Sequence, residues 1–179
     1  MNPRKIREDF PIFKDTELAY LDNAATSQKP RKVIDRIKKF YEEENSNVGR
    51  GLYDLASKTT QNHEAARKTV SDFIGSTSSK EIVFVRNTSE AINLVAESLE
   101  IDGNIVIPEM AHHSNQLPWR KKARKKDLEI KWIPSREGKL DIEAAKEIID
   151  EETAIVSVSN VSNVFGCINP IEELAEFAH

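Results

Sequence analysis

Two kinds of hydrophobic pattern divide this sequence at about residue 75. In the N-terminal part, apolar residues recur every three to four positions over residues 30–44 and 55–74, and this spacing predicts two amphipathic helices. Gly75 stands where the second helix needs a residue that adopts a left-handed backbone. The Gly- and Asn-rich residues 45–53 predict the loop between these helices, and residues 1–28 predict an irregular arm.

After residue 75, short apolar runs alternate with helical patterns. The runs predict strands, and the patterns between them predict helices. Because strands that alternate with helices form βαβ crossovers, the sequence predicts an α/β domain over residues 76–179, with a mostly parallel sheet, flanking helices and residues 1–75 as a helical N-terminal arm. The predicted strands span residues 81–86, 104–108, 128–133 and 153–159, and the predicted helices span residues 88–99, 113–126, 141–150 and a segment that begins at Pro170.

The last predicted helix has a well-marked start. Asn169 is a residue type that caps helix N-termini, and Pro170 is favoured at the first helical position. Apolar residues then recur at helical spacing. No Gly, Asn or Pro follows them up to His179, so the sequence holds no stop signal for this helix.

Composition narrows the class of protein. Charged residues make up 31% of the chain and the mean hydropathy is −0.53, values typical of a soluble protein. No apolar run approaches the roughly 20 residues of a transmembrane helix, and the first residues lack the apolar segment of a secretory signal. A single cysteine allows no internal disulfide and suits a reducing compartment. These features predict a cytoplasmic protein without a membrane partner.

Net charge and the placement of the reactive residues argue against a nucleic-acid partner, a nucleophilic Cys167 and a metal site. A net charge of −4 argues against a nucleic-acid partner, and we interpret the basic residues 120–126 as a solvated helix face. Cys167 has no histidine near it in the sequence, so we interpret it as a buried small residue rather than a nucleophile. The adjacent His112 and His113 cannot share one helical face, and we predict no metal site.

The first candidate site lies where the strand at 81–86 meets its helix. Asn87 is suited to cap the helix, and Glu90 stands three residues later as in a capping box. Thr88 and Ser89 then offer backbone N–H groups and hydroxyls at the positive end of the helix, which favours an anion, most naturally a phosphate. A capped helix without a ligand would show the same residues, because such caps are common.

Two more candidate segments follow the strands at 104–108 and 153–159. His112 begins one of them and could stack on a planar ligand, and Asn163 belongs to the other, which is rich in Ser, Asn and Gly. Surface histidines at a helix start and ordinary turn chemistry remain the alternatives. Because all the candidate segments follow strands of one parallel sheet, we expect them to lie along the same edge, where open α/β sheets bind ligands.

Taken together, several motifs resemble the aminotransferase class V family of pyridoxal-phosphate (PLP) enzymes, and within it the SufS-type cysteine desulfurases and selenocysteine lyases. The resemblance covers essentially the whole chain in order. It implies the N-terminal half of the large domain of fold type I PLP-dependent transferases. The motifs are YLDNAAT at 20–26, QKP at 28–30, NVGRG at 47–51, VFVRNTSEAINLVA at 83–96, HHSN at 112–115, PW at 118–119 and VSNVFG at 161–166.

The resemblance implies roles at matching positions. Thr88 and Ser89 would hold the phosphate of PLP. His112 would be catalytic, stacking on the pyridine ring and assisting proton transfers. Asn163 would hydrogen-bond the phenolic oxygen of the cofactor and stand near the substrate carboxylate.

Substrate contacts are implied in the N-terminal part as well. The backbone at Ala24 and Ala25 would border the substrate, and Arg50 would lie near a subunit boundary close to it. Gly49 stands where this subgroup commonly has a histidine, so a substrate role for that position is not carried over.

Members of the family are about twice as long as this chain of 179 residues. The remaining half carries the Schiff-base lysine, the aspartate that pairs with the pyridine nitrogen, the arginine for the substrate carboxylate and the nucleophilic cysteine. We therefore expect an N-terminal subunit of a split cysteine desulfurase that is inactive alone and supplies persulfide sulfur for iron–sulfur cluster assembly or other sulfur transfer. Its expected partners are a complementing C-terminal polypeptide that supplies the lysine, a second such pair in a dimer, L-cysteine and a sulfur-acceptor protein. The alternatives are a non-catalytic remnant that acts as a binding or regulatory subunit, or a fragment of another enzyme of this family.

Overall fold

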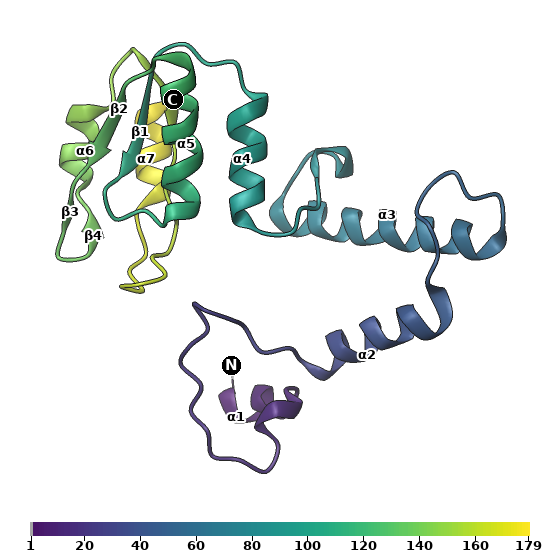
Figure 1. Ribbon diagram of the computed structural model, residues 1–179. Coiled ribbons are helices and arrows are strands. Elements are labelled where there is room, and N and C mark those ends of the chain that lie inside the picture. The colour runs from purple at the N-terminus through teal and green to yellow at the C-terminus, as the bar shows by residue number, and fades with distance from the viewer. Residues whose placement is uncertain (1) are drawn as a thin grey trace. The chain divides into compact units, whose positions relative to one another are not determined.

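The computed structural model describes residues 2–179, which form two compact units that divide between Phe84 and Val85 (Figure 1). The sequence predicts a boundary near residue 75, at the end of a long helix. In the structure, a short helical turn and an extended segment follow that helix before the second unit begins.

The first unit is helical. The predicted helix over residues 30–44 forms as α2 and continues as a π-helical turn, which is wider than a turn of α-helix because its hydrogen bonds join residues five apart. The predicted helix over residues 55–74 forms one residue longer and ends at Gly75, whose φ of 72° confirms the expected left-handed cap. The elements are α1 (Pro3–Arg7), the 3-10 turn η1 (Pro11–Phe13), α2 (Arg31–Lys39), the π turn η2 (Phe40–Glu44), α3 (Asp54–Ile74) and the 3-10 turn η3 (Ser79–Glu81).

A buried carboxylate joins η2 to α3. Glu44 is only 4% exposed, and it accepts hydrogen bonds from Arg36 Nη2 at 2.9 Å and Asn62 Nδ2 at 3.1 Å. The hydroxyl of Thr59 donates to the backbone oxygen of Glu44 at 2.7 Å. A buried charge is tolerated only when it is paired and hydrogen-bonded, so this network fixes the turn against the long helix.

The second unit contains a parallel sheet of three strands in the order β2-β1-β5. The strands are β1 (Asn104–Pro108), β2 (Ile130–Ile133) and β5 (Thr153–Val156). β1 is buried along its whole length because it has a strand on each side and helices on each face. The predicted parallel α/β architecture is confirmed.

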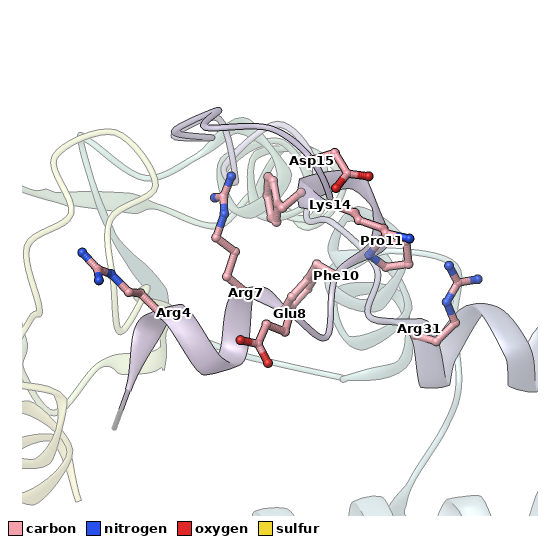
Figure 2. Close-up of a pocket in the computed structure, with 9 residues that line it drawn as sticks. Arg4, Arg7, Glu8, Phe10, Pro11, Lys14, Asp15 and Arg31 are labelled. Atoms are coloured by element: carbon pink, nitrogen blue, oxygen red, sulfur yellow. The ribbon is translucent and has the colours of Figure 1, made fainter.

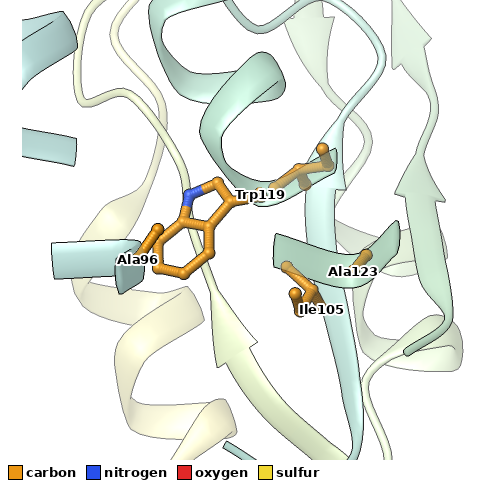
Figure 3. Close-up of a cluster of buried hydrophobic side chains, with 5 residues drawn as sticks. Ala96, Ile105, Trp119 and Ala123 are labelled. Atoms are coloured by element: carbon orange, nitrogen blue, oxygen red, sulfur yellow. The ribbon is translucent and has the colours of Figure 1, made fainter. Parts of the chain in front are cut away.

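Helices cover both faces of this sheet. On one face, Trp119 and Ala123 of α5 (His113–Lys126) and Ala96 of α4 (Thr88–Ser98) pack against Ile105 and Ile107, and Figure 3 shows the indole reaching toward Ala96. The other face is covered by α6 (Ile142–Ile148) and α7 (Ile171–Ala178). The buried side chains of this second cluster are Val106, Ile133, Leu140, Ala145 and Leu174.

The prediction of a strand over residues 81–86 is wrong. Residues 82–87 form no regular element, and Val83 and Phe84 are 64% and 49% exposed although their side chains are apolar. A strand is stabilised through hydrogen bonds to a neighbouring strand, and among residues 2–179 no strand pairs with this segment. The hydrophobic pattern of a segment does not show whether a partner strand lies beside it.

The structure contains a hairpin that the pattern of hydrophobic positions does not predict. The two-residue strands β3 (Ser135–Arg136) and β4 (Lys139–Leu140) pair antiparallel around Glu137 and Gly138. Both turn residues have positive φ, 51° and 77°, as a type I′ turn requires. The Glu-Gly pair was the only local signal, because strands this short show no periodicity.

The predicted cap of the last helix is also wrong. The N-cap of α7 is Pro170, with no side-chain cap. The side chain of Asn169 turns away from the helix: its Nδ2 donates to the oxygen of Ser159 at 2.7 Å, and its Oδ1 accepts from the N–H of Leu140 at 3.3 Å. Asn169 is 6% exposed, so satisfying buried backbone groups of two other segments outweighs capping.

The basic helix α5 is largely as predicted. Lys121 and Lys125 are exposed and pair with Glu97 of α4 at 2.9 and 3.2 Å. Lys122 departs from the prediction, because it is 4% exposed and its ammonium donates to the backbone oxygen of Leu99 near the end of α4. Across the part of the chain that the structure describes, no helix is both long and apolar enough to cross a membrane.

Candidate functional site

The candidate site lies at the carboxyl ends of β1 and β5. The loop that leads from β1 into α5 and the loop that leads from β5 toward α7 meet there, at the same end of the unit as the start of α4 (Figure 1). A hollow of about 10 Å³ between the two loops is lined by both His112 and Asn163. That volume holds about one water molecule, so a larger ligand would lie on the exposed surface of these loops.

His112 is held in one orientation by the start of α5. It is the N-cap residue, and its ring Nδ1 accepts a hydrogen bond from the backbone N–H of Ser114 at 3.1 Å and lies 2.9 Å from the Ser114 hydroxyl. Because Nδ1 is an acceptor, the neutral ring carries its proton on Nε2. The side chain is exposed, so Nε2–H and a ring face are available to a ligand.

Asn163 begins a turn at the tip of the loop after β5. The hydroxyl oxygen of Ser162 accepts from the N–H groups of Val164 and Phe165 at 3.3 and 3.1 Å, and the N–H of Gly166 donates to the oxygen of Ser162 at 3.0 Å. The turn is thus closed by its own residues. Within the described chain, the amide of Asn163 makes no hydrogen bond, and its side chain is exposed.

Two buried asparagines support these loops. Asn115 is 5% exposed, and its Nδ2 donates to the backbone oxygen of Ser157 at 2.9 Å. Its Oδ1 accepts from the Ser157 hydroxyl at 2.6 Å and from Trp119 Nε1 at 3.2 Å. On the other side of the loop after β5, Asn169 likewise forms hydrogen bonds with backbone groups, those of Ser159 and Leu140. Sequence reasoning assigned no such role to either residue, and the signal that could have found them is a polar residue where the neighbouring pattern requires burial.

Thr88 and Ser89 form the first turn of α4. Asn87 caps this helix as predicted, because its Oδ1 accepts from the N–H of Glu90 at 2.9 Å. Glu90 turns back to Arg86 rather than to the cap residue: it accepts from the Arg86 N–H at 2.7 Å and from Nε at 3.0 Å. These bonds from Arg86 lower the pKa of Glu90 and keep it ionised.

This arrangement leaves the hydroxyls of Thr88 and Ser89 exposed at the positive end of α4. Arg86 offsets the negative charge of Glu90, which would otherwise repel an anion at the same turn. The role of this turn as a phosphate site stays a prediction.

The remaining predicted residues belong to the first unit. Ala24 and Ala25 lie in a turn in which the N–H of Ala25 donates to the oxygen of Asp22 at 3.2 Å, and the Tyr20 hydroxyl donates to the same oxygen at 3.0 Å. Arg50 is exposed, with a φ of 54°. The structure therefore brings His112 and Asn163 together in one hollow and describes these three residues only within their own unit.

The single cysteine is engaged locally. The thiol of Cys167 is half-buried and donates to the backbone oxygen of Gly138 at 2.8 Å. This contact ties the loop after β5 to the β3–β4 hairpin, a structural role in line with the prediction. Among residues 2–179, no group of three or more His, Cys, Asp or Glu side chains is placed to hold a metal ion.

The first unit has a larger hollow, of about 510 Å³, formed by the N-terminal arm and the start of α2 (Figure 2). Cationic side chains border it, and internal contacts occupy two of them, Arg7 and Arg31. Arg7 lies 4.5 Å from the ring centroid of Phe13 and donates to the oxygen of Thr16 at 2.8 Å. Arg31 pairs with Asp35 at 3.8 Å. We interpret this hollow as the inside of a bent arm.

The chain matches known proteins of one family. Residues 19–179 match the family model described as Aminotransferase class-V. The chain is 43% identical to a probable cysteine desulfurase of Synechocystis sp., over 97% of this chain and 44% of that protein. It is 42% identical to a cysteine desulfurase of Dickeya dadantii, over 98% of this chain and 45% of that protein.

Solved structures agree. A cysteine desulfurase from Thermococcus onnurineus in its apo form superposes with a TM-score of 0.89 at 38% identity, covering 99% of this chain and 45% of that one. The cysteine desulfurase CsdA of Escherichia coli superposes with a TM-score of 0.83 at 31% identity, covering 100% and 46%. The chain thus spans less than half the length of these relatives, and it matches their N-terminal half.

Proposed function

Because the chain belongs to the aminotransferase class-V family, we propose that it forms the N-terminal half of a PLP-dependent cysteine desulfurase that a second polypeptide completes. One observation carries the desulfurase part of this proposal: the chain aligns over 97–98% of its length with desulfurases at 42–43% identity. The proposed reaction converts L-cysteine and a thiol to alanine and a persulfide. The carbon–sulfur bond of cysteine breaks, and its sulfur passes to the thiol.

The residues at the edge of the sheet fit a phosphorylated aromatic cofactor. The start of α4 offers Thr88 and Ser89 for a phosphate, the ring of His112 offers an exposed face for stacking, and Asn163 offers a free amide. When bound, PLP withdraws electrons from the α-carbon of an amino-acid substrate. The protein residues in this half would bind and orient the cofactor and leave its covalent anchoring to a lysine of the partner chain.

His112 has the features of a residue that exchanges protons near a substrate. Its Nδ1 is occupied by Ser114, which leaves Nε2 as the one ring nitrogen that faces outward with a proton. His112 is therefore the proposed catalytic residue of this half. Asn163, beside it, would hydrogen-bond the phenolic oxygen of the cofactor and stand near the substrate carboxylate. Substrate contacts by the backbone at Ala24 and Ala25 and by Arg50, in the first unit, are a separate part of the proposal.

The complementing polypeptide must supply the other reactive groups. The proposal assigns to it the anchoring lysine, the partner of the pyridine nitrogen, the arginine for the carboxylate and the nucleophilic cysteine. Cys167 is not proposed as that cysteine, because its thiol donates a hydrogen bond to the backbone oxygen of Gly138 within the fold. We further propose that two such pairs form a dimer in the cytoplasm and that the persulfide passes to an acceptor protein for iron–sulfur cluster assembly.

Co-expression with a C-terminal half tests the proposal. The probe is the part of the Thermococcus onnurineus desulfurase that lies beyond its matched 45%. We expect the co-purified pair to show a visible absorption band after PLP is added and to release alanine from L-cysteine, and each chain alone to release none. His112→Ala should lower the rate in the pair by about 10²–10⁴-fold, whereas the matched variant His113→Ala, at the neighbouring exposed histidine, should retain most of it.

A bound pair that stays colourless and makes no alanine would contradict the proposal. A pair that binds but shows no change on titration with PLP would favour the alternative of a non-catalytic binding or regulatory subunit.

A further inference from the structure

The loop that carries Asn163 is a small hairpin. Its two sides are joined by an isolated antiparallel bridge between Val161 and Ile168. We call residues 161–168 the Asn163 hairpin. Hydrogen bonds to the Ser162 hydroxyl oxygen close the turn at its tip, where Asn163 lies. Asn163 therefore moves with this hairpin as a whole.

The Asn163 hairpin has little support from its own apolar side chains. A single two-stranded hairpin is only marginally stable in water unless it packs against another element. The large apolar side chains of this one are between 51% and 74% exposed. They are Val161, Val164, Phe165 and Ile168. The position of the hairpin therefore depends on its contacts with other segments.

The turn of the β3–β4 hairpin contacts it through Gly138. The backbone oxygen of Gly138 accepts a hydrogen bond from the Cys167 thiol at 2.8 Å. The ring of Phe165 packs against the α-carbon of Gly138, where a Cβ would lie 2.9 Å from both Cγ and Cδ1 of the ring. Cys167 and Phe165 stand on the two sides of Gly166, so one residue of the β3–β4 turn holds the Asn163 hairpin at two points.

The close approach of the ring, and not only the turn, requires glycine at position 138. Gly138 has a φ of 77°, but the preceding turn residue, Glu137, carries a side chain at a φ of 51°. A left-handed backbone in this turn is therefore compatible with a side chain. At Gly138, however, a Cβ would lie closer to the Phe165 ring than real Cβ atoms approach other heavy atoms, so the ring would have to move.

The opposite side of the candidate site is held by a different element. His112 is fixed by the backbone N–H of Ser114 at the start of α5. It lines the small hollow together with Ser162 and Asn163. The position of Asn163 relative to His112 thus depends on where the Asn163 hairpin is held, and a ligand that touches both residues would sense a displacement of that hairpin.

We propose that Gly138 is a positioning residue of the candidate site. By holding the Asn163 hairpin through two side chains, it keeps the amide of Asn163 in reach of a ligand that lies against His112. This inference rests on the proposed function, because it takes PLP as that ligand. Asn163 would touch the cofactor, whereas Gly138 acts only through the hairpin.

Hydrogen exchange of the chain by itself tests the contact without any cofactor. Gly138→Ala forces a Cβ against the ring, and Phe165→Ala removes the ring while it leaves the glycine in place. We expect both variants to exchange faster over residues 161–168 and to be unchanged over residues 113–126. Glu137→Ala, the matched control in the same turn, should leave both segments unchanged. Unchanged exchange over residues 161–168 in both test variants would overturn the proposal.

Titration with PLP tests the consequence for the site. The pair formed with the C-terminal half of the Thermococcus onnurineus desulfurase is titrated, and the dissociation constant of PLP is read from the visible absorption band. Gly138→Ala should raise this constant about three- to tenfold, the effect of losing one hydrogen bond. Phe165→Ala, which adds no backbone strain, should also raise it, and Glu137→Ala should change it less than about twofold.

A double variant distinguishes positioning from a general loss of structure. If Gly138 acts through the amide, Gly138→Ala should weaken PLP binding no further in a chain that already carries Asn163→Ala. Equal weakening with and without Asn163→Ala overturns the proposal, because the effect then reaches the cofactor by another route. Cys167→Ser keeps a donor for the Gly138 oxygen and should therefore bind PLP more tightly than Cys167→Ala.

The outcomes separate this inference from the proposed function. If the unmodified pair makes alanine and Gly138→Ala binds PLP equally tightly, only the positioning role fails. If the unmodified pair binds PLP without making alanine, weaker binding by Gly138→Ala supports the positioning role and contradicts the proposed activity. An unmodified pair that binds no PLP contradicts both.

Discussion

Replacing Asn115 with alanine removes the side chain that joins α5 to the end of β5. Asn115 makes three hydrogen bonds in the interior: one to the backbone oxygen of Ser157, one from the Ser157 hydroxyl and one from the indole N–H of Trp119. Alanine fills none of these positions. The Ser157 oxygen and the indole N–H then lie in a site too enclosed for water to replace the amide easily, since Asn115 is 5% exposed and Trp119 is 3% exposed.

The expected cost follows from the groups left without partners. A buried polar group that loses its partner costs about 1–3 kcal/mol. With two such groups, and some relief because the Ser157 hydroxyl can rotate, we expect the free energy of unfolding to fall by about 3 kcal/mol. With a urea dependence of about 2 kcal/mol per molar, the unfolding midpoint should fall by about 1.5 M.

Urea unfolding followed by tryptophan fluorescence measures this change, and Trp119 reports from the site itself. The matched control is Gln116→Ala, which removes one exposed bond from Nε2 to the oxygen of Glu109 at 2.9 Å and should cost less than about 1 kcal/mol. Equal midpoints for Asn115→Ala and Gln116→Ala would refute the assignment of a supporting role to the buried amide.

Three further predictions concern stability. The ammonium of Lys131 and neighbouring donors lower the pKa of Asp150 from 3.8 to about 2. The ionised Asp150 therefore stabilises the fold above about pH 4, and this contribution is lost as the pH falls toward 2. When urea midpoints are measured against pH, Asp150→Asn should flatten the curve in that range. Gly103→Ala, at a φ of 120° and against the backbone oxygen that precedes β5, should lower the thermal midpoint much more than Gly75→Ala, where open space surrounds the new Cβ and the left-handed backbone alone costs about 1–2 kcal/mol. Leu174→Ala should cost about 2–5 kcal/mol of unfolding free energy in chemical denaturation, because this side chain is 2% exposed; a loss below 1 kcal/mol would contradict its place in the core.

The sequence predicts elements well where each carries its own signal. The helix at 113–126 and the strand at 104–108 form with the predicted bounds. The helix begins at a capping residue and ends at Asp127, whose φ of 56° closes it. The strand is a continuous apolar run, and it is buried from both sides. In both cases the local pattern and the final environment favour the same structure.

Prediction fails where stability depends on a distant segment. Residues 81–86 contain the short apolar run that is typical of a strand, yet their backbone lacks a partner strand among residues 2–179. Asn169 has the residue type of a helix cap, yet it bonds instead to Leu140 and Ser159, which are 29 and 10 residues away. Neither partner is visible in a local window of sequence, because both are set by how the hairpin and loop fold against each other.

The candidate site shows the same division between local and distant causes. His112 and Asn163 were predictable because each follows a strand of one parallel sheet, and strand ends converge at one edge whatever the details of packing. What holds them there was not predictable. Asn115 and Asn169 are the same kind of residue as Asn163, but they are buried and hydrogen-bonded through both the amide nitrogen and the amide oxygen. Asn163 is exposed, and its amide has no partner within the described chain. Only an amide that the fold has not already used can bind a ligand, so burial and bonding separate the supporting residues from the candidate binding residues where residue type cannot.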